Sequence, residues 1–470
     1  MIANPSPQVD IIPTSSRRFH LKAIVYIFVI IFGLGTWTNL AGLWVELPII
    51  VPILPESWQL PAKLTLIINA ANIFPILLVF ASIIFKLNTA PFEIPVNFVL
   101  LVTSTTLAVA FAFLWDKTAY LFGREQSVCL MCLCFFTAVA DCISSTTFIP
   151  FLHRYEPLYL NAYFTGEALT ALLPALVGIS QGIGTSDCVI PDDKINQTLI
   201  EVHHPPRFSV RTYFLLLSSL PLAALLAFSS LHLMKTGRIE KKTAIKKSKH
   251  HQSRIFILMD NIQDIGIIQN TMKTIDKIEN QLETNKKKIQ STGFATSKPG
   301  FFLFIVFQSS AMLYGICPGL TTFSLNAYSA TTFHYTIIAN SFAYPIMTLI
   351  GAFIPEVSPK SISFLYMTHT IFFVYIFLTA IFSPCPPLVN SILGHIIIFF
   401  VWILIYLTGS YIRILMGNYF RKKKDHRGLV WFGLATQIGA FVGSFIIFIL
   451  TNISELFKER NICDKTSQCF

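Results

Sequence analysis

Charged residues are scarce in this sequence. Asp, Glu, Lys and Arg together make up 13% of the 470 residues, whereas hydrophobic residues make up 53%. Soluble domains usually carry a charged fraction of roughly 25%. The low charge therefore excludes an ordinary soluble protein and predicts a polytopic membrane protein.

The residue patterns of common enzymes and of metal sites are missing as well. No nucleophile with a placed base and no glycine-rich phosphate loop is recognisable. The nine cysteines show no paired Cys-x-x-Cys spacing, and four of them fall inside one apolar run. We therefore expect no enzyme, no metal site and no cofactor.

The basic residues have a distribution that nucleic-acid binding does not explain. The formal net charge is +11, but the lysines and arginines gather between the apolar runs, where they set membrane topology. We expect a lipid bilayer and a small-molecule substrate as partners, and no nucleic acid. The oligomeric state is left open.

Long apolar runs divide the chain. A helix needs about 20 apolar residues to cross the hydrocarbon core of a bilayer. Eleven runs of about this length lie near residues 21–45, 64–85, 95–115, 127–151, 158–184, 212–234, 300–323, 332–354, 362–382, 388–412 and 429–453. The sequence therefore predicts an all-α membrane protein with about 11 transmembrane helices.

The positive-inside rule predicts how these helices are oriented. With a cytoplasmic N-terminus and an extracellular C-terminus, most of the 35 lysines and arginines fall in cytoplasmic segments. The extracellular side then carries glycosylation sequons at Asn196 and Asn452. It also carries Cys385 and Cys463, which could form a disulfide there, although a Cys463–Cys469 bridge or free thiols are open alternatives.

A basic linker at residues 235–298 separates six predicted spans from five. The other predicted parts are a cytoplasmic segment at 1–20, a first bundle at 21–234, a second bundle at 299–453 and an extracellular tail at 454–470. Two bundles joined in this way suit a carrier whose bundles rock about a central site. The 6+5 arrangement is major-facilitator-like and similar to that of the equilibrative nucleoside transporters, which by itself does not identify a substrate.

The stretch from residue 33 to residue 61 has features that a plain membrane anchor does not need. An amide, Asn39, and an indole, Trp44, lie at membrane depth, and Glu46 follows. We expect Pro48, Pro52 and Pro55, which follow Glu46, to prevent a regular helix from continuing. Such groups suggest a lined cavity.

Three strings of residues resemble one family. GLWVELPIIVPILPESWQLP at 42–61 resembles the signature of the eukaryotic riboflavin (vitamin B2) transporter family of solute carriers. ADCISSTTFIPFL at 140–152 and ALTALLPALVGISQGIG at 168–184 resemble its fourth and fifth helices. The resemblance covers about residues 20–455 outside the linker. It implies a plasma-membrane carrier that takes up riboflavin by alternating access.

Riboflavin is a flat, uncharged ring system with a uracil-like edge and a polyol tail. A site for it should combine aromatic faces with uncharged amides and hydroxyls. Asn69 and Asn72 are three residues apart and therefore share a helix face. The alternative for each amide is an interhelical hydrogen bond that only holds the bundle together. The candidates are Asn39, Trp44, Asn69, Asn72, Gln181, Gln308, Tyr314, Asn340 and Tyr344.

Three carboxylates are candidates for a gate or for proton coupling. Asp141 and Glu167 lie well inside predicted spans, where each is either a coupling group or a structural acid. Glu46 lies at the predicted outer end of the first span, as a gate contact or an interfacial cap.

Glycine and proline in the seventh run predict a hinge. Gly315, Pro318 and Gly319 fall in the middle of the membrane, where a broken helix frees backbone groups. Gly33 and Gly35 are the expected counterparts in the first run.

Two other functions share some of these features. A carrier for a nucleoside or another flat heterocycle needs the same aromatic faces and amides. A ligand receptor that transports nothing also needs a lined cavity, although eleven spans with termini on opposite sides argue against the seven-span receptor plan. The sequence does not separate facilitated diffusion from proton coupling.

Overall fold

The computed structural model describes residues 15–84, 92–121, 123–152, 155, 157–183, 186–189, 200–203, 205–233, 299–351, 359–422, 426–454 and 456–460. The linker at 235–298, Asn196 and Cys463 lie outside these residues. The linker, the glycan at Asn196 and the Cys385–Cys463 bridge therefore stay predictions.

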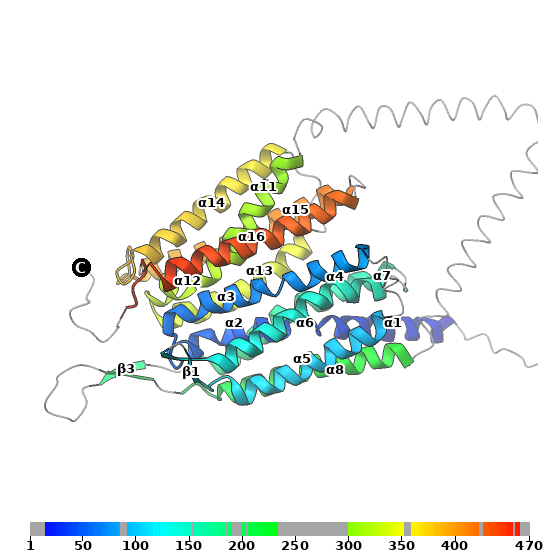
Figure 1. The fold of residues 1–470 in the computed structure, drawn as a ribbon, viewed down its shortest axis with the longest axis horizontal. Coiled ribbons are helices and arrows are strands. Elements are labelled where there is room, and N and C mark those ends of the chain that lie inside the picture. Colours follow the sequence, from blue (N-terminus) through cyan, green and yellow to red (C-terminus); the bar gives the residue numbers. More distant parts are fainter. Residues whose placement is uncertain are drawn as a thin grey trace, which may run out of the picture.

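Helices make up nearly all of the described chain (Figure 1). The first half contains α1 (Ser15–Gly33), α2 (Thr38–Ile50), the 3-10 turn η1 (Ser57–Gln59), α3 (Leu60–Ala70), α4 (Ile73–Ile84), α5 (Glu93–Leu114), α6 (Val128–Leu152), α7 (Pro157–Gln181) and α8 (Val210–Leu233). The second half contains α11 (Pro299–Ser310), η2 (Ala311–Ile316), α12 (Cys317–Thr321), η3 (Thr322–Asn326), α13 (Ala330–Gly351), α14 (Pro359–Ile381), α15 (Ile392–Lys422) and α16 (His426–Asn452).

Two short antiparallel hairpins connect helices of the first half. β1 (Ala119–Leu121) pairs with β2 (Arg124–Gln126), and β3 (Ser186–Val189) pairs with β4 (Ile200–His203). Both hairpins lie at the same end of the molecule (Figure 1).

The apolar runs correspond to helices. Nine helices of the described chain are long and apolar enough to cross a membrane, and the bent pair α1–α2 makes ten. The remaining predicted run, 332–354, is α13, which is 22 residues long but carries polar residues such as His334 and Asn340. The structure thus confirms the predicted all-α membrane architecture.

The first predicted span is broken in its middle. α1 ends at Gly33, α2 begins at Thr38, and the two helices are bent by 51°. The Thr36 hydroxyl donates to the Gly33 carbonyl at 3.0 Å, and the Thr38 hydroxyl donates to the Leu34 carbonyl at 2.7 Å. These bonds satisfy carbonyls that the break leaves without helical partners, as a membrane interior requires.

The prediction that Pro48, Pro52 and Pro55 end the helix is confirmed in part. α2 runs through Pro48 but ends at Ile50, before Pro52 and Pro55, so Pro48 removes a backbone hydrogen bond without ending the helix. Glu46 lies one turn before the end of α2, and its side chain has no exposed surface.

The seventh run is helical throughout but changes its pitch. Residues 311–316 and 322–326 form π-helix on either side of the short α12, which contains Pro318 and Gly319. π-Helical turns are rare and are frequent at functional sites. A hinge at this position stays a prediction.

The helices form two sets. α1–α8 pack mainly on one another, as do α11–α16. The sets meet where α2 and α7 contact α13, and where α3 contacts α12 and α16. We call the end that carries β1, β3 and residues 456–460 the tail end. The end where α8 stops and α11 begins is the linker end (Figure 1).

Glycines allow close helix contacts within each set. A Cβ on Gly33 would lie 2.6 Å from the Tyr163 carbonyl and 2.9 Å from Gly166 Cα. A Cβ on Gly315 would lie 2.6 Å from Gly443 Cα. Small residues serve this purpose in membrane helix pairs, so packing alone accounts for these glycines.

Replacing Gly443 by alanine should destabilise the protein. The added methyl group would collide with the Ala311 carbonyl, which belongs to a neighbouring helix. We expect a cost of about 1–3 kcal/mol. The matched control is Gly433→Ala on the same helix, where a Cβ meets nothing within 4 Å. Thermal unfolding in one detergent checks this, and an equal loss in both variants would contradict it.

Candidate functional site

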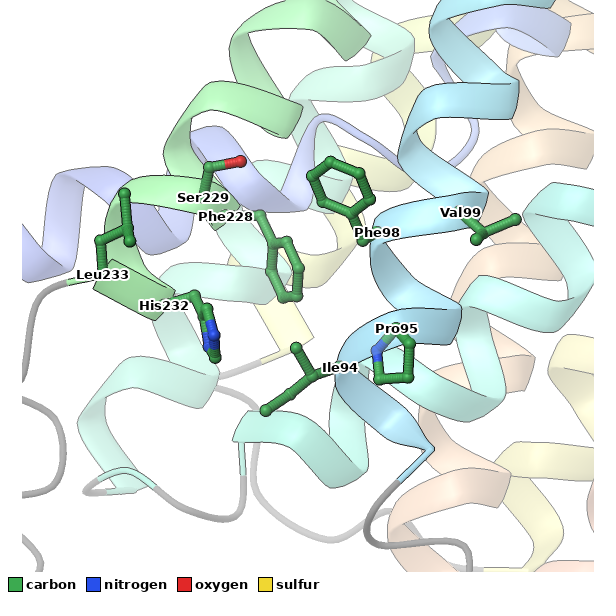
Figure 2. A pocket seen from close by; sticks show the side chains of 8 residues that line it. All are labelled: Ile94, Pro95, Phe98, Val99, Phe228, Ser229, His232 and Leu233. Atoms are coloured by element: carbon green, nitrogen blue, oxygen red, sulfur yellow. The ribbon is translucent and has the colours of Figure 1, made fainter.

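Two surface pockets lie away from the predicted site residues. A pocket of about 450 Å³ lies between α5 and α8, and Figure 2 shows its mostly apolar lining with Ser229 and His232. A second pocket, of about 380 Å³, is lined by residues of α13 and α15 that include Tyr335 and His395. No predicted substrate-binding residue lines either pocket. Several of these residues, such as Asn39, Asn69 and Asn340, are instead buried between helices.

Asn39 has a structural partner. Its amide on α2 donates to the Ser104 carbonyl at 3.0 Å and to the Ser104 hydroxyl at 3.1 Å on α5. The side chain is buried. This is the interhelical bond that we gave as the alternative to substrate binding.

Asn69 and Asn72 come together, as their spacing predicted. The Asn72 amide donates to Asn69 Oδ1 at 3.4 Å, and the Cys142 thiol donates to Asn72 Oδ1 at 3.0 Å. The Asn69 amide also donates to the Tyr314 carbonyl at 3.1 Å. This bond joins α3 to the π-helical turn η2 and so connects the two sets of helices.

Arg413 is a candidate site residue that the sequence did not predict. The predicted tenth run ends at residue 412, but α15 continues to Lys422. Arg413 therefore lies nine residues, about 13 Å at 1.5 Å per residue, before the helix end. The signal for it was present, because apolar and aromatic residues such as Ile414, Tyr419 and Phe420 continue beyond Arg413.

The Arg413 side chain faces groups of both helix sets. Its Nη1 donates to the Tyr314 hydroxyl at 3.3 Å, and its guanidinium carbon lies 5.5 Å from the centre of the Tyr314 ring. It also interacts electrostatically with Tyr344 on α13 and with Glu167 on α7. It forms no ion pair with Glu167 within 4.0 Å, and its side chain keeps accessible surface.

The Asn340 amide has no hydrogen-bond partner among the described residues. Its amide nitrogen and its amide oxygen are both buried, and neither has a partner among the described residues. Asn340 and Tyr344 are one helical turn apart on a face of α13 that points away from the exposed Tyr335. Buried amides are almost always paired with protein, water or ligand, so Asn340 needs water or another polar molecule as its partner.

Glu46 and Gln181 form a buried pair near the tail end. Gln181 Nε2 donates to Glu46 Oε1 at 2.9 Å and to the Phe208 carbonyl at 3.1 Å. Glu46 Oε2 and Gln181 Oε1 are buried and have no partner among the described residues. The pair joins α2 to α7. Each of these two unpaired oxygens can still accept a hydrogen bond.

Asp141 and Glu56 lie in different surroundings. Asp141 is buried on α6, next to Cys142. The Glu56 carboxylate accepts bonds from the Ser127 backbone N–H at 2.8 Å and the Ser127 hydroxyl at 2.6 Å, and so caps the start of α6. For Glu56 the geometry is that of a helix cap.

The remaining predicted residues are less informative. Trp44 is half-buried and packs against the main apolar cluster, and Gln308 is half-buried on α11. The Asn452 amide donates to the Phe448 carbonyl at 3.1 Å at the end of α16, and its glycosylation stays a prediction. Among the described residues, no group of three His, Cys, Asp or Glu side chains could hold a metal ion.

Relatives of known name cover almost the whole chain. The chain is 31% identical to the solute carrier family 52 riboflavin transporter member 3-B of Danio rerio, over 94% of this chain and 99% of the relative. It is 29% identical to member 3 of Homo sapiens, over 94% and 98%. It is 30% identical to the riboflavin transporter rft-1 of Caenorhabditis elegans, over 94% and 100%. By their names these relatives are transporters and not enzymes.

Solved transporters align with the chain at low identity. The nucleoside transporter NupG aligns with a TM-score of 0.47 and 9% identity, over 91% of this chain and 90% of that one. A D-xylose–proton symporter aligns with a TM-score of 0.49 and 12% identity, over 93% and 92%. The model of the family "Solute carrier family 52, riboflavin transporter" matches residues 21–459. The chain therefore belongs to the solute carrier family 52 of riboflavin transporters.

Proposed function

We propose that this chain carries riboflavin into the cell across the plasma membrane by alternating access. The family match over residues 21–459 supports the cargo. One structural observation supports a place for it: the Asn340 amide is buried with neither of its polar atoms paired among the described residues.

The chemistry of the riboflavin ring suits Asn340. The uracil-like edge offers a carbonyl acceptor beside an N–H donor, and an amide offers one donor group and one acceptor. Asn340 can therefore bind this edge through two hydrogen bonds. Tyr344 on the same face, and Tyr314 beside Arg413, supply aromatic surface for the ring.

Contacts between the two helix sets support a state that is closed at the tail end. The Thr322 hydroxyl donates to the Trp58 carbonyl at 2.7 Å, and Trp58 and Phe323 have ring centres 5.8 Å apart. Closer to the linker end, Glu167 and Arg413 face each other without an ion pair. The positive-inside rule places the linker end in the cytoplasm. We therefore propose that the structure is closed on the extracellular side.

Glu167 and Arg413 suit a contact of the opposite, outward-facing state. They belong to different helix sets and carry opposite charges. If the linker end closes while the tail end opens, the two side chains approach and can form an ion pair, which is strong where water is excluded. Glu46 and Asp141 are the other acids available for proton coupling, and facilitated diffusion is the simpler mode.

Uptake of radiolabelled riboflavin into cells that express the chain tests the proposal. We expect saturable uptake that lumichrome inhibits and uridine does not, because lumichrome keeps the three-ring system. Uptake rates of the parent and of Asp141→Asn, each measured at pH 6 and at pH 8, test whether transport is coupled to protons. Uptake that is faster at pH 6 and loses this dependence in Asp141→Asn indicates proton coupling through Asp141.

Two results would contradict this proposal. No uptake despite surface expression would exclude riboflavin as the cargo. Strong inhibition by uridine with none by lumichrome would replace the flavin with a nucleoside. Uptake that ignores both pH and the Asp141 variant would keep the carrier and make it a facilitator with Asp141 as a structural acid.

Replacing Asn340 or Asn39 by leucine should have opposite effects on stability and on the KM for riboflavin. Asn340→Leu removes an unpaired buried amide, so stability should hold or rise, while the KM for riboflavin rises about tenfold because ligand bonds worth 1–3 kcal/mol are lost. Asn39→Leu removes the bonds to Ser104, so stability should fall by about 1–3 kcal/mol with little change in KM. Thermal unfolding and uptake kinetics measure both quantities. An unchanged KM in Asn340→Leu would exclude Asn340 from the site.

A further inference from the structure

Residues 456–460, which follow α16, form a tail strap at the tail end. Phe457 is buried, with its ring centre 5.3 Å from that of Phe323 and 6.1 Å from that of Phe377. The Ser383 hydroxyl donates to the Lys458 carbonyl at 2.6 Å. The Arg460 guanidinium donates to the Ala327 carbonyl at 2.7 Å. These contacts fix the strap to the second helix set.

Glu459 reaches from this strap to the first helix set. Its Oε2 accepts a bond from the Ser57 hydroxyl at 3.2 Å, and its Oε1 accepts a bond from the Trp58 backbone N–H at 3.3 Å. Both donors belong to η1, which leads directly into α3. The carboxylate therefore sits where the free N–H groups of a helix start favour a negative charge, and it caps this helix from the other set.

The turn that Glu459 binds is conformationally strained. Ser57 has a φ of +48°, in the left-handed region that residues other than glycine rarely adopt. Such a conformation persists only where surrounding contacts hold it, and it is typical of switch regions. The bonds from Glu459 to Ser57 and Trp58 are contacts of this kind.

Other contacts between the sets converge on the same turn. Trp58 accepts the Thr322 hydroxyl bond and packs on Phe323, which in turn packs on Phe457 of the tail strap. Glu459 adds a charged group to this group of contacts, and its side chain is exposed, so water can replace its bonds. A contact of this kind can form and break during a transport cycle.

We propose that Glu459 is a gate residue: its carboxylate latches the tail strap of the second helix set onto the Ser57–Trp58 turn of the first, and this latch must open before the tail end opens. The inference rests on the proposed transport cycle. The latch is local to the tail end, so it can be tested without riboflavin.

Thiol labelling at position 62 reports on the latch. Ala62 on α3 is buried at the contact between the sets, where a Cβ on Gly319 would lie 3.3 Å from Ala62 Cα. The full-length Ala62→Cys protein is purified in detergent and labelled with a maleimide, and labelling at position 62 is quantified by mass spectrometry. Adding Glu459→Ala should raise the labelling rate about fivefold or more, because two bonds that favour the closed state are lost.

The neighbouring Lys458→Ala is the matched control. Lys458 is equally exposed, but only its backbone carbonyl bonds to the protein, so this variant should label at the parental rate. Equal labelling rates in the parent and in Glu459→Ala would overturn the proposal. Because the assay needs no substrate, a protein that fails to transport riboflavin would count against the proposed function and not against the latch.

Cross-linking provides a second test if the Ala62→Cys protein does not fold. A short bifunctional methanethiosulfonate, which joins the two cysteines through disulfides, should stop riboflavin uptake when applied to Ser57→Cys/Glu459→Cys, and a reductant that cleaves these disulfides should restore it. The two single-cysteine variants control for native cysteines. Quantitative cross-linking that leaves uptake unchanged would also overturn the latch.

Discussion

The absence of water from the bilayer interior is the constraint on which the rest of this structure depends. Each polar group in a span must find a partner within the protein or in a substrate. The amides of Asn39 and Asn69 have such partners, on Ser104 and Tyr314. Asn340 has none among the described residues. This difference is the basis of our proposal that Asn340 binds the transported molecule.

The same constraint shapes how the two helix sets meet. At the tail end, direct hydrogen bonds connect the turn at Ser57 and Trp58 with Thr322 and Glu459. Closer to the linker end, Arg413 donates a hydrogen bond to Tyr314 of its own set and forms no ion pair with Glu167 of the other set. Contacts that close one end between two helix sets are what a carrier needs to exchange access between two sides.

Much of the fold could be predicted, because apolar runs define membrane helices and the 42–61 string resembles the family's signature. The site was harder to predict. Length and apolarity do not show whether an amide is paired, so Asn39 and Asn340 looked alike in the sequence. Arg413 was missed because a charge was taken as the end of a span, although α15 continues to Lys422. Glu46 lies near the end of α2, but its burial and its bond to Gln181 could not be read from the sequence.

The most direct test of this account is a structure determined by cryo-electron microscopy with riboflavin bound. The account predicts that the uracil-like edge of the ring lies within hydrogen-bond distance of the Asn340 amide, with Tyr344 or Tyr314 against the ring. It also predicts that the Asn39–Ser104 bond is unchanged. A ring bound elsewhere, with Asn340 still unpaired, would contradict the claim that unpaired buried amides mark the transport site.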